Sequence, residues 1–172
     1  GSSFVIDPRV WTFDQWGEDP VGCYNGSPIY TLDSSAGITS SNELSEITQS
    51  PDTNLSLFVS PEDRHLIALG AHDGSADDPM LIRWCSSEDY TDWTPTITNT
   101  AGDKRLDRGT RIWQGIRSNK QTIILTDLAA YTMYLSGFPE IFTVLQIGDE
   151  CGGVSPHCGT AHNDAAYWFG YD

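Results

Sequence analysis

The chain has 172 residues, 38% of them hydrophobic and 11% aromatic, which is enough for one domain with a real core and argues against disorder. Its 24 acidic and 9 basic residues give a net charge of −15, which disfavours binding to the phosphates of a nucleic acid. Its apolar runs are shorter than the roughly 20 residues of a membrane-spanning helix, so we expect no membrane insertion. The start of the chain has no signal-peptide pattern and no initiator Met, which is consistent with a processed product or a fragment of a longer protein.

The N-terminal part, residues 1–54, predicts two extended pieces and a long loop. The extended pieces are 10–13 and 28–32, and a turn containing Gly and Asn lies between them. The loop, 33–51, is rich in Ser, Thr and Asn, and residues 42–46 could begin a short helix that Pro51 would end.

The remaining part, residues 55–172, predicts short strands bounded by Gly, Pro, Asp, Asn or Ser. The expected strands are 55–59, 66–69, 80–84, 122–126, 131–135, 142–147 and 165–169. Helical periodicity is hard to find in this part, so the sequence predicts a single all-β domain.

A turn followed by two strands recurs loosely, with centres at Ile67, Ile124 and Tyr167. The intervals are 57 and 43 residues, and a four-stranded propeller blade takes ~40–50. The longer interval would need an insertion, such as residues 72–78. We therefore expect propeller-like blades of antiparallel strands. An incomplete propeller is the open alternative, since a closed ring of ~4–8 blades needs a longer chain.

The stretch 78–106 is the most organised part of the sequence. After the strand at 80–84 comes an acidic connection in which Ser87, Asp89 and Asp92 are expected to hold a tight structural turn. Trp93 is expected to plug this turn onto the strands below, followed by an extended Thr-rich piece at 94–100 and a turn at 101–103. The turn is one residue short of the S-x-D-x-G-x-T-W pattern found in sugar-handling propellers, where it is usually structural.

The charge is unevenly distributed along the chain. Residues 1–100 hold 16 acidic and 3 basic residues, and all six bases of the second half fall in one stretch: Lys104, Arg105, Arg108, Arg111, Arg117 and Lys120. One interpretation is a solvated hairpin. The other is a contact with the acidic first half of a neighbouring subunit, in which case changing Arg108 and Arg111 to Glu would weaken assembly.

Candidate sites for chemistry are few. Adjacent acids, as at Glu88 and Asp89, are more typical of solvated turns than of a glycosidase pair. The loop 71–78 lacks the full calcium-loop pattern and its closing Glu. Four zinc-capable residues do not have zinc spacing: Cys151, His157, Cys158 and His162. We expect no catalytic residues, no metal and no cofactor.

The four cysteines, Cys23, Cys85, Cys151 and Cys158, do not form a dense disulfide framework, and we expect reduced thiols in a protein assembled in a cytosol. A secreted β-domain with two disulfides is the alternative. The larger aromatic residues are expected to serve core or inter-subunit packing: Trp11, Trp16, Trp84, Trp113, Tyr131, Tyr134 and Trp168.

Three segments, in this order, resemble a family of tailed-phage virion proteins: DPMLIRWCSSEDYTDWTPTITNTAGDKRL, TIILTDLAAYTMYLSGFPEIFTVLQIGDECGGVSPH and AAYWFG. Two upstream segments, WTFDQWGEDPVGCYNGSPIYTLD and VSPEDRHLIALGA, also resemble that family, so the resemblance covers nearly the whole chain. The sequence departs from the family in three respects. Members are usually several times longer, Ser is commoner at the position of Cys85, and the loop 33–51 has no counterpart.

The resemblance implies a β-propeller-like tail component similar to a nozzle or tail hub. Such proteins form a homo-oligomeric ring, commonly six-fold, below the portal and adaptor proteins, and genomic DNA leaves through it. The expected location is the tail of the virion, and the host cytoplasm during assembly. An acidic channel wall would repel the duplex and let it slide without specific binding. The alternative function is a glycan-binding or glycan-cleaving propeller domain.

Overall fold

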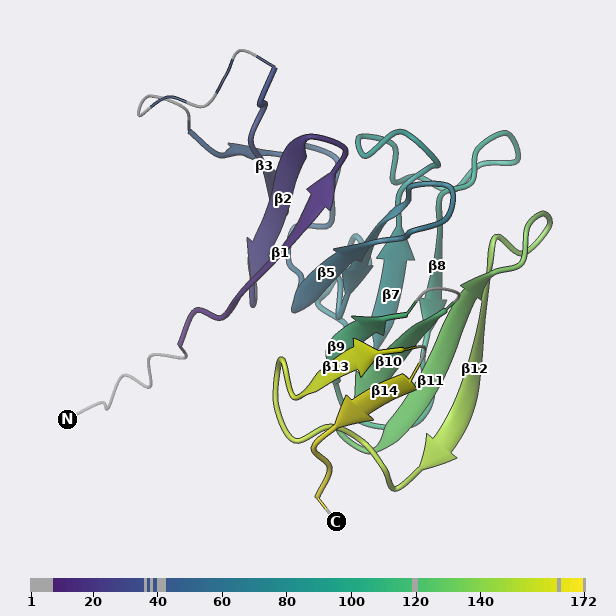
Figure 1. Cartoon of the computed structure of the whole chain (residues 1–172). Helices are drawn as coiled ribbons and strands as arrows, with labels where there is room; N and C mark the ends of the chain where they lie inside the picture. The colour runs from purple at the N-terminus through teal and green to yellow at the C-terminus, as the bar shows by residue number, and fades with distance from the viewer. Residues whose placement is uncertain are drawn as a thin grey trace.

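The computed structural model describes residues 8–35, 37, 39, 43–118, 121–163 and 165–171 (Figure 1). In these residues the protein contains fourteen strands and no helix, which confirms the all-β prediction. It follows that the described residues hold no helix with the length and apolarity to cross a membrane.

The strands form three four-stranded antiparallel sheets and one hairpin, each built from strands consecutive in the chain. Sheet 1 contains β1 (Trp11–Trp16), β2 (Asp19–Tyr24), β3 (Tyr30–Thr31) and β4 (Ser45–Glu46). Sheet 2 contains β5 (Ser56–Val59), β6 (Leu66–Leu69), β7 (Leu81–Trp84) and β8 (Gly102–Arg105). Sheet 3 contains β9 (Ile112–Arg117), β10 (Thr122–Thr126), β11 (Ala129–Leu135) and β12 (Phe142–Asp149). The C-terminal hairpin contains β13 (Gly159–His162) and β14 (Ala165–Trp168).

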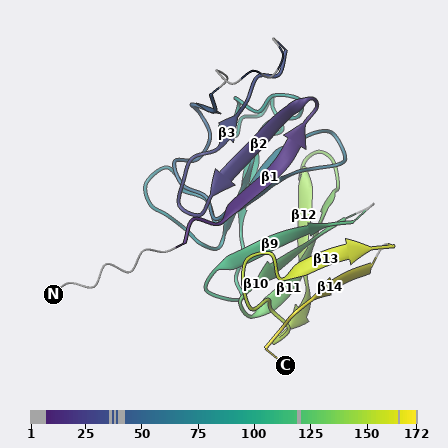
Figure 2. The same ribbon diagram turned by 60° about the vertical axis from the view of Figure 1, so that its left-hand side comes forward.

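The sheets are stacked in chain order, and their first strands lie next to one another. Strand β1 packs against β5, β5 against β9, and β9 against β13. Figure 1 shows the hairpin in front of sheet 3, and Figure 2 shows sheet 1 and the hairpin at opposite ends of the stack. The first strands therefore follow one another along one side of the molecule.

Each neighbouring pair of sheets encloses its own apolar core. Leu57 and Val59 of β5 face sheet 1, while Phe58 between them faces sheet 3. In β10, Ile124 packs toward sheet 2, whereas Ile123 and Leu125 pack toward the hairpin. Successive side chains of a strand point to opposite faces, so a strand covered on both faces reads as an unbroken apolar run.

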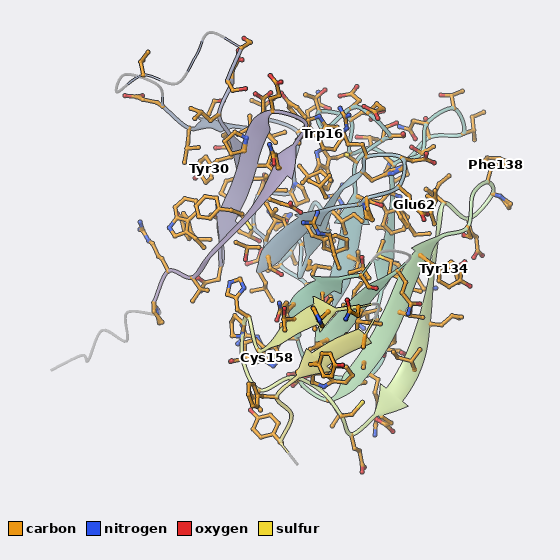
Figure 3. The ribbon with its side chains drawn as sticks, viewed as in Figure 1. Trp16, Tyr30, Glu62, Tyr134, Phe138 and Cys158 are labelled. Atoms are coloured by element: carbon orange, nitrogen blue, oxygen red, sulfur yellow. The ribbon has the colours of Figure 1, made fainter. Side chains whose placement is uncertain are left out.

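The two ends of the stack have exposed outer faces. On sheet 1, Trp11 and Phe13 are exposed and their rings stack at 5.3 Å, with Tyr24 edge-on to Trp11. On the hairpin, Tyr167 and Phe169 are exposed. Figure 3 shows Tyr30 on the side of sheet 1 turned away from sheet 2, and Phe138 at the tip of the β11–β12 loop.

The repetition expected from the sequence falls on equivalent strands. Ile67, Ile124 and Tyr167 lie on β6, β10 and β14, the second strands of their sheets. The extra length between the first two comes from the predicted 72–78 segment and also from the long β7–β8 connection, 85–101.

Two local predictions are wrong. The Thr-rich piece 94–100 is not a strand, and Gly102 and Asp103 of the turn expected at 101–103 are instead the first residues of β8. Gly102 pairs with Trp84, and a glycine fits there because a Cβ would lie only 2.6 Å from the Trp84 indole. In the second case, the described part of 42–46 holds the short strand β4 and no helix, and Asn42 lies outside the described residues.

Candidate functional site

The five described basic residues of the stretch 104–120 come from three different parts of the chain. Lys104 and Arg105 lie on β8 of sheet 2, Arg108 and Arg111 in the connection to sheet 3, and Arg117 on β9. Lys120 lies outside the described residues. The stretch therefore runs from one sheet to the next and does not form a hairpin.

Two of these side chains, Arg105 and Arg108, bind exposed or partly exposed acids of the same chain. Arg105 pairs with Asp78 at 2.7 Å, and Arg108 pairs with Asp149 at 2.7 Å through a two-pronged contact. The Arg108 guanidinium lowers the pKa of the Asp149 carboxyl. Changing Arg108 to Glu would therefore break a contact within the subunit, and a loss of assembly would not by itself report a contact between subunits.

Arg117 joins three sheets in one polar cluster. Its Nη1 lies 2.9 Å from Asp14 Oδ2 on β1 and donates to the Val59 carbonyl of β5 at 3.0 Å. The same Asp14 oxygen accepts the Val59 backbone N–H at 2.7 Å. We call Asp14, Val59 and Arg117 the inter-sheet clamp.

The acidic turn in the β7–β8 connection is closed by hydrogen bonds. Asp89 accepts from both the backbone N–H and the hydroxyl of Thr91, and these bonds lower the pKa of its carboxyl. Asp92 accepts from the side-chain amide of Asn99, and Ser87 donates to the Asp63 carbonyl. Trp93 is 1% exposed and donates its indole N–H to the Tyr90 carbonyl, so it is not accessible to a ligand.

The four cysteines are free thiols, and Cys23, Cys85 and Cys158 are buried. Burial raises the pKa of Cys23 and of Cys85 to about 12. Within the described residues, no cluster of three or more His, Cys, Asp or Glu side chains could hold a metal ion. In the loop 71–78, the Asp73 carboxylate is used by Ser75 and Ala76, whose hydrogen bonds lower its pKa to about 2.

A cavity of about 200 Å³ lies along the first strands of the three sheets. We call it the inner cavity. Its lining includes Asp14 of β1, Ser56 and Phe58 of β5, and Trp113 and Arg117 of β9. Gly115 lets β9 approach β5 closely, since a Cβ there would lie 2.8 Å from the Phe58 ring. Asp14 and Arg117 of the inter-sheet clamp thus line this cavity.

The remaining candidates are the outer faces of the stack. The N-terminal face is the exposed side of sheet 1 with Trp11, Phe13, Tyr24 and Tyr30. The C-terminal face is the exposed side of the hairpin with Tyr167 and Phe169. Trp11 and Phe13 alternate with Thr12 and Asp14, and this alternation is the signal in the sequence that could have separated exposed from covered aromatic residues.

No family model matches this sequence, and none of the curated proteins matches it.

Proposed function

We propose that this protein is a structural subunit of a phage tail, similar to a nozzle or hub, and that it acts by assembling into a ring. The observation that carries the proposal is the pair of exposed aromatic faces at the two ends of the stack. Exposed apolar patches of this kind mark sites of protein association. The ordered motifs of the tail-protein resemblance and the net charge of −15 also support it.

We further propose that the sheets are successive blades of an open β-propeller arc. This is supported by the four consecutive antiparallel strands of each full sheet and by the first strands β1, β5, β9 and β13, which lie side by side. In this arrangement the first strands would line the inner side of the arc.

The two end faces differ from each other, so their association would be head to tail. The N-terminal face of one subunit would contact the C-terminal face of the next, and such contacts give a ring if the rotation closes. A six-fold ring, with the portal and adaptor as neighbours, is the form that the resemblance supports. DNA would pass such an acidic assembly without specific binding.

Mixing two variants tests this proposal. Trp11→Glu places a charge in the N-terminal face and Tyr167→Glu places one in the C-terminal face, and each charge should weaken association about a hundredfold or more. In mass photometry and negative-stain electron microscopy we expect rings for the unchanged protein and monomers for each variant. The two variants together should form a one-to-one dimer, because each retains the face that the other has lost.

The matched control is Ile97→Glu, which changes a 96% exposed side chain in the β7–β8 connection and should leave assembly intact. The proposal fails if the unchanged protein is monomeric at about 100 μM, a concentration at which even weak interfaces associate. It also fails if the single variants assemble normally.

A further inference from the structure

The last strand of sheet 3 leaves the outer edge of that sheet open. In the described residues β12 pairs only with β11, and it lies at the right-hand margin of the molecule in Figure 1. The Ser136 N–H donates to the Ile141 carbonyl, which therefore points toward β11. Backbone groups alternate in direction along an antiparallel strand, so those of Phe142, Val144 and Gln146 point away from β11. None of the described residues hydrogen-bonds to these outward groups.

This edge lacks the protection found on the last strands of sheets 1 and 2. Natural edge strands are commonly short or charged, which discourages pairing with another chain. Strand β4 has two residues, one of them Glu46, and β8 consists of Gly, Asp, Lys and Arg. Strand β12 has eight residues, more than any other described strand, and residues 141–148 carry no charge. The open edge of β12 is therefore suited to pairing with another strand.

A β-bulge limits the regular part of this edge. Tyr131 of β11 pairs with Gln146, whereas the preceding Ala130 pairs with Gly148, so Ile147 is the extra residue on β12. A bulge bends its strand and disrupts the regular hydrogen bonding there. We therefore expect regular pairing on the outer edge over residues 142–146, Phe-Thr-Val-Leu-Gln. We call these five residues the edge segment.

The backbone of the edge segment is complementary to a second copy of itself. In an antiparallel pair related by a two-fold axis, Val144 can lie opposite the same residue of the other copy, and Phe142 then lies opposite Gln146. These are the three residues whose backbone groups point outward, so every outward N–H and C=O of the edge segment gains a partner. A shift of this register in either direction would leave some of them unpaired.

The side chains of the edge segment suit the same pairing. Leu145 is 51% exposed, and Tyr134 (Figure 3), also exposed, lies diagonal to it on β11. In the two-fold pair Leu145 lies opposite Thr143 of the other copy, which would cover part of this apolar surface. The edge segment carries no charge, so its pairing brings no two like charges face to face, although the chain has a net charge of −15.

The space next to the edge segment is open to an incoming strand. A hollow of about 540 Å³ is lined by residues of β8 and β12, among them Gly102, Lys104 and Phe142. Directly opposed residues of paired strands point their side chains to the same side of the sheet. Gln146 of the second copy, opposite Phe142, would therefore place its amide in this hollow, where Lys104 and Asp103 offer hydrogen-bonding groups.

We propose that β12 is a homodimerisation edge, in which two copies of the chain pair their edge segments antiparallel about a two-fold axis at Val144. This contact is separate from the head-to-tail contact, since no residue of β12 belongs to an end face. An interface of one strand pair is small, so we expect a Kd on the order of 10 μM. Such a dimer dissociates at the nanomolar concentrations of mass photometry and does not disturb the measurement of rings.

Sedimentation equilibrium of the Trp11→Glu variant measures the edge contact with the head-to-tail contact removed. We expect dimers at about 100 μM, well above the expected Kd. Adding both Thr143→Lys and Leu145→Lys should weaken dimerisation about tenfold, because a lysine then faces a lysine at two points. These lysines also make the chain less acidic, so a general charge repulsion between copies would change in the opposite direction.

The matched control combines Thr143→Lys with Leu145→Glu. Each lysine then faces a glutamate of the other copy, so dimerisation should be retained. Both positions lie on the face of sheet 3 away from the core that Met133 and Val144 share, and the two double variants should therefore fold alike.

Disulfide cross-linking with oxidised glutathione tests the register. Val144→Cys should give a covalent dimer, because the Cα atoms of a hydrogen-bonded pair lie ~5.5 Å apart, within the range of a disulfide. Leu145→Cys should not, since its two copies lie diagonally, at ~7–8 Å. The unchanged protein under the same conditions shows any contribution from Cys151, the native thiol that is only partly buried.

The proposal is overturned if the Trp11→Glu variant is monomeric at about 100 μM. It is also overturned if the two-lysine variant dimerises as tightly as its parent, if the lysine–glutamate control is weakened as much, or if position 145 cross-links in preference to 144. A monomeric Trp11→Glu variant together with rings of the unchanged protein would refute the edge contact alone, whereas edge dimers without rings would refute the head-to-tail assembly alone.

Discussion

At the scale of single residues, His65 is a buried titratable group with an incomplete set of partners. It is 1% exposed, its Nε2 lies 3.0 Å from the Thr100 hydroxyl, and its Nδ1 has no partner among the described residues. Its ring also packs edge-on against Phe142 at 5.0 Å. Burial lowers its pKa below the usual 6.5, because the charged form would lose its hydration.

We therefore predict that His65 makes the protein less stable as the pH falls below about 6.5. In that range the unfolded chain takes up a proton on His65 that the folded protein does not, which favours unfolding. Between pH 7.5 and 5.5, the unfolding free energy in urea should fall by about 1 kcal/mol more in the unchanged protein than in His65→Gln. Parallel pH profiles for the two proteins would contradict this. Carboxyls with lowered pKa values, such as Asp73 at about 2, titrate well below this window.

At the scale of elements, the β7–β8 connection is a long loop that places one large side chain, Trp93, in the core. Trp93 belongs to the core between sheets 1 and 2, and the Arg83 guanidinium donates to its carbonyl at 3.1 Å. Tyr90, which accepts the Trp93 indole N–H, packs edge-on against Trp16 of sheet 1. The loop thus contributes to the packing between the two sheets.

Trp93→Ala should lower the unfolding free energy by about 3–5 kcal/mol, since it removes a fully buried indole and leaves a cavity. Ile97→Ala, at an exposed position in the same loop, should change it by less than about 0.5 kcal/mol. Urea titrations followed by near-ultraviolet circular dichroism measure both. Equal stability of the two variants would show that the indole does not anchor the loop.

The strands that the sequence predicted best are those covered on both faces. The apolar runs of β5, β6, β7 and β10 were recognisable because burial on two sides leaves no polar alternation. Strands β2, β9 and β13 were not predicted. These strands contain Pro20, Gly115 and Gly159, which are residue types that favour turns. The glycines are explained by packing against neighbouring strands. For example, a Cβ on Gly159 would lie 2.3 Å from the Ile116 side chain.

The inner cavity could not be predicted for a related reason. Ser56 and Trp113 lie in different sheets, and nothing in the sequence indicates that they line the same cavity. The Asp89 part of the expected turn was more accessible, because Asp89 bonds to Thr91 two residues further on, whereas the bond from Ser87 to the Asp63 carbonyl spans 24 residues.

At the scale of the whole molecule, the inter-sheet clamp is the polar contact that joins sheets 1, 2 and 3 at one point. Arg117→Met should lower the unfolding free energy by about 1–2 kcal/mol, because the Asp14 carboxylate, whose side chain is 10% exposed, loses its charged partner. In a double-mutant cycle with Asp14→Asn, the two changes should cost less together than the sum of their separate effects. The control is Lys104→Met, at an exposed basic residue that forms no ion pair with the described residues. Additive effects of the changes at positions 14 and 117 would refute the clamp.

The consecutive order of strands within each sheet has a consequence for synthesis on the ribosome. All pairing partners of sheet 2 fall within residues 56–105, so its hydrogen bonds can form as soon as that segment has emerged. Each completed sheet then exposes an apolar face that the next segment covers, so folding can proceed from the N-terminus in the order of translation. The newest face is always the one at risk, and a pause between two sheets would prolong its exposure to aggregation and to chaperones.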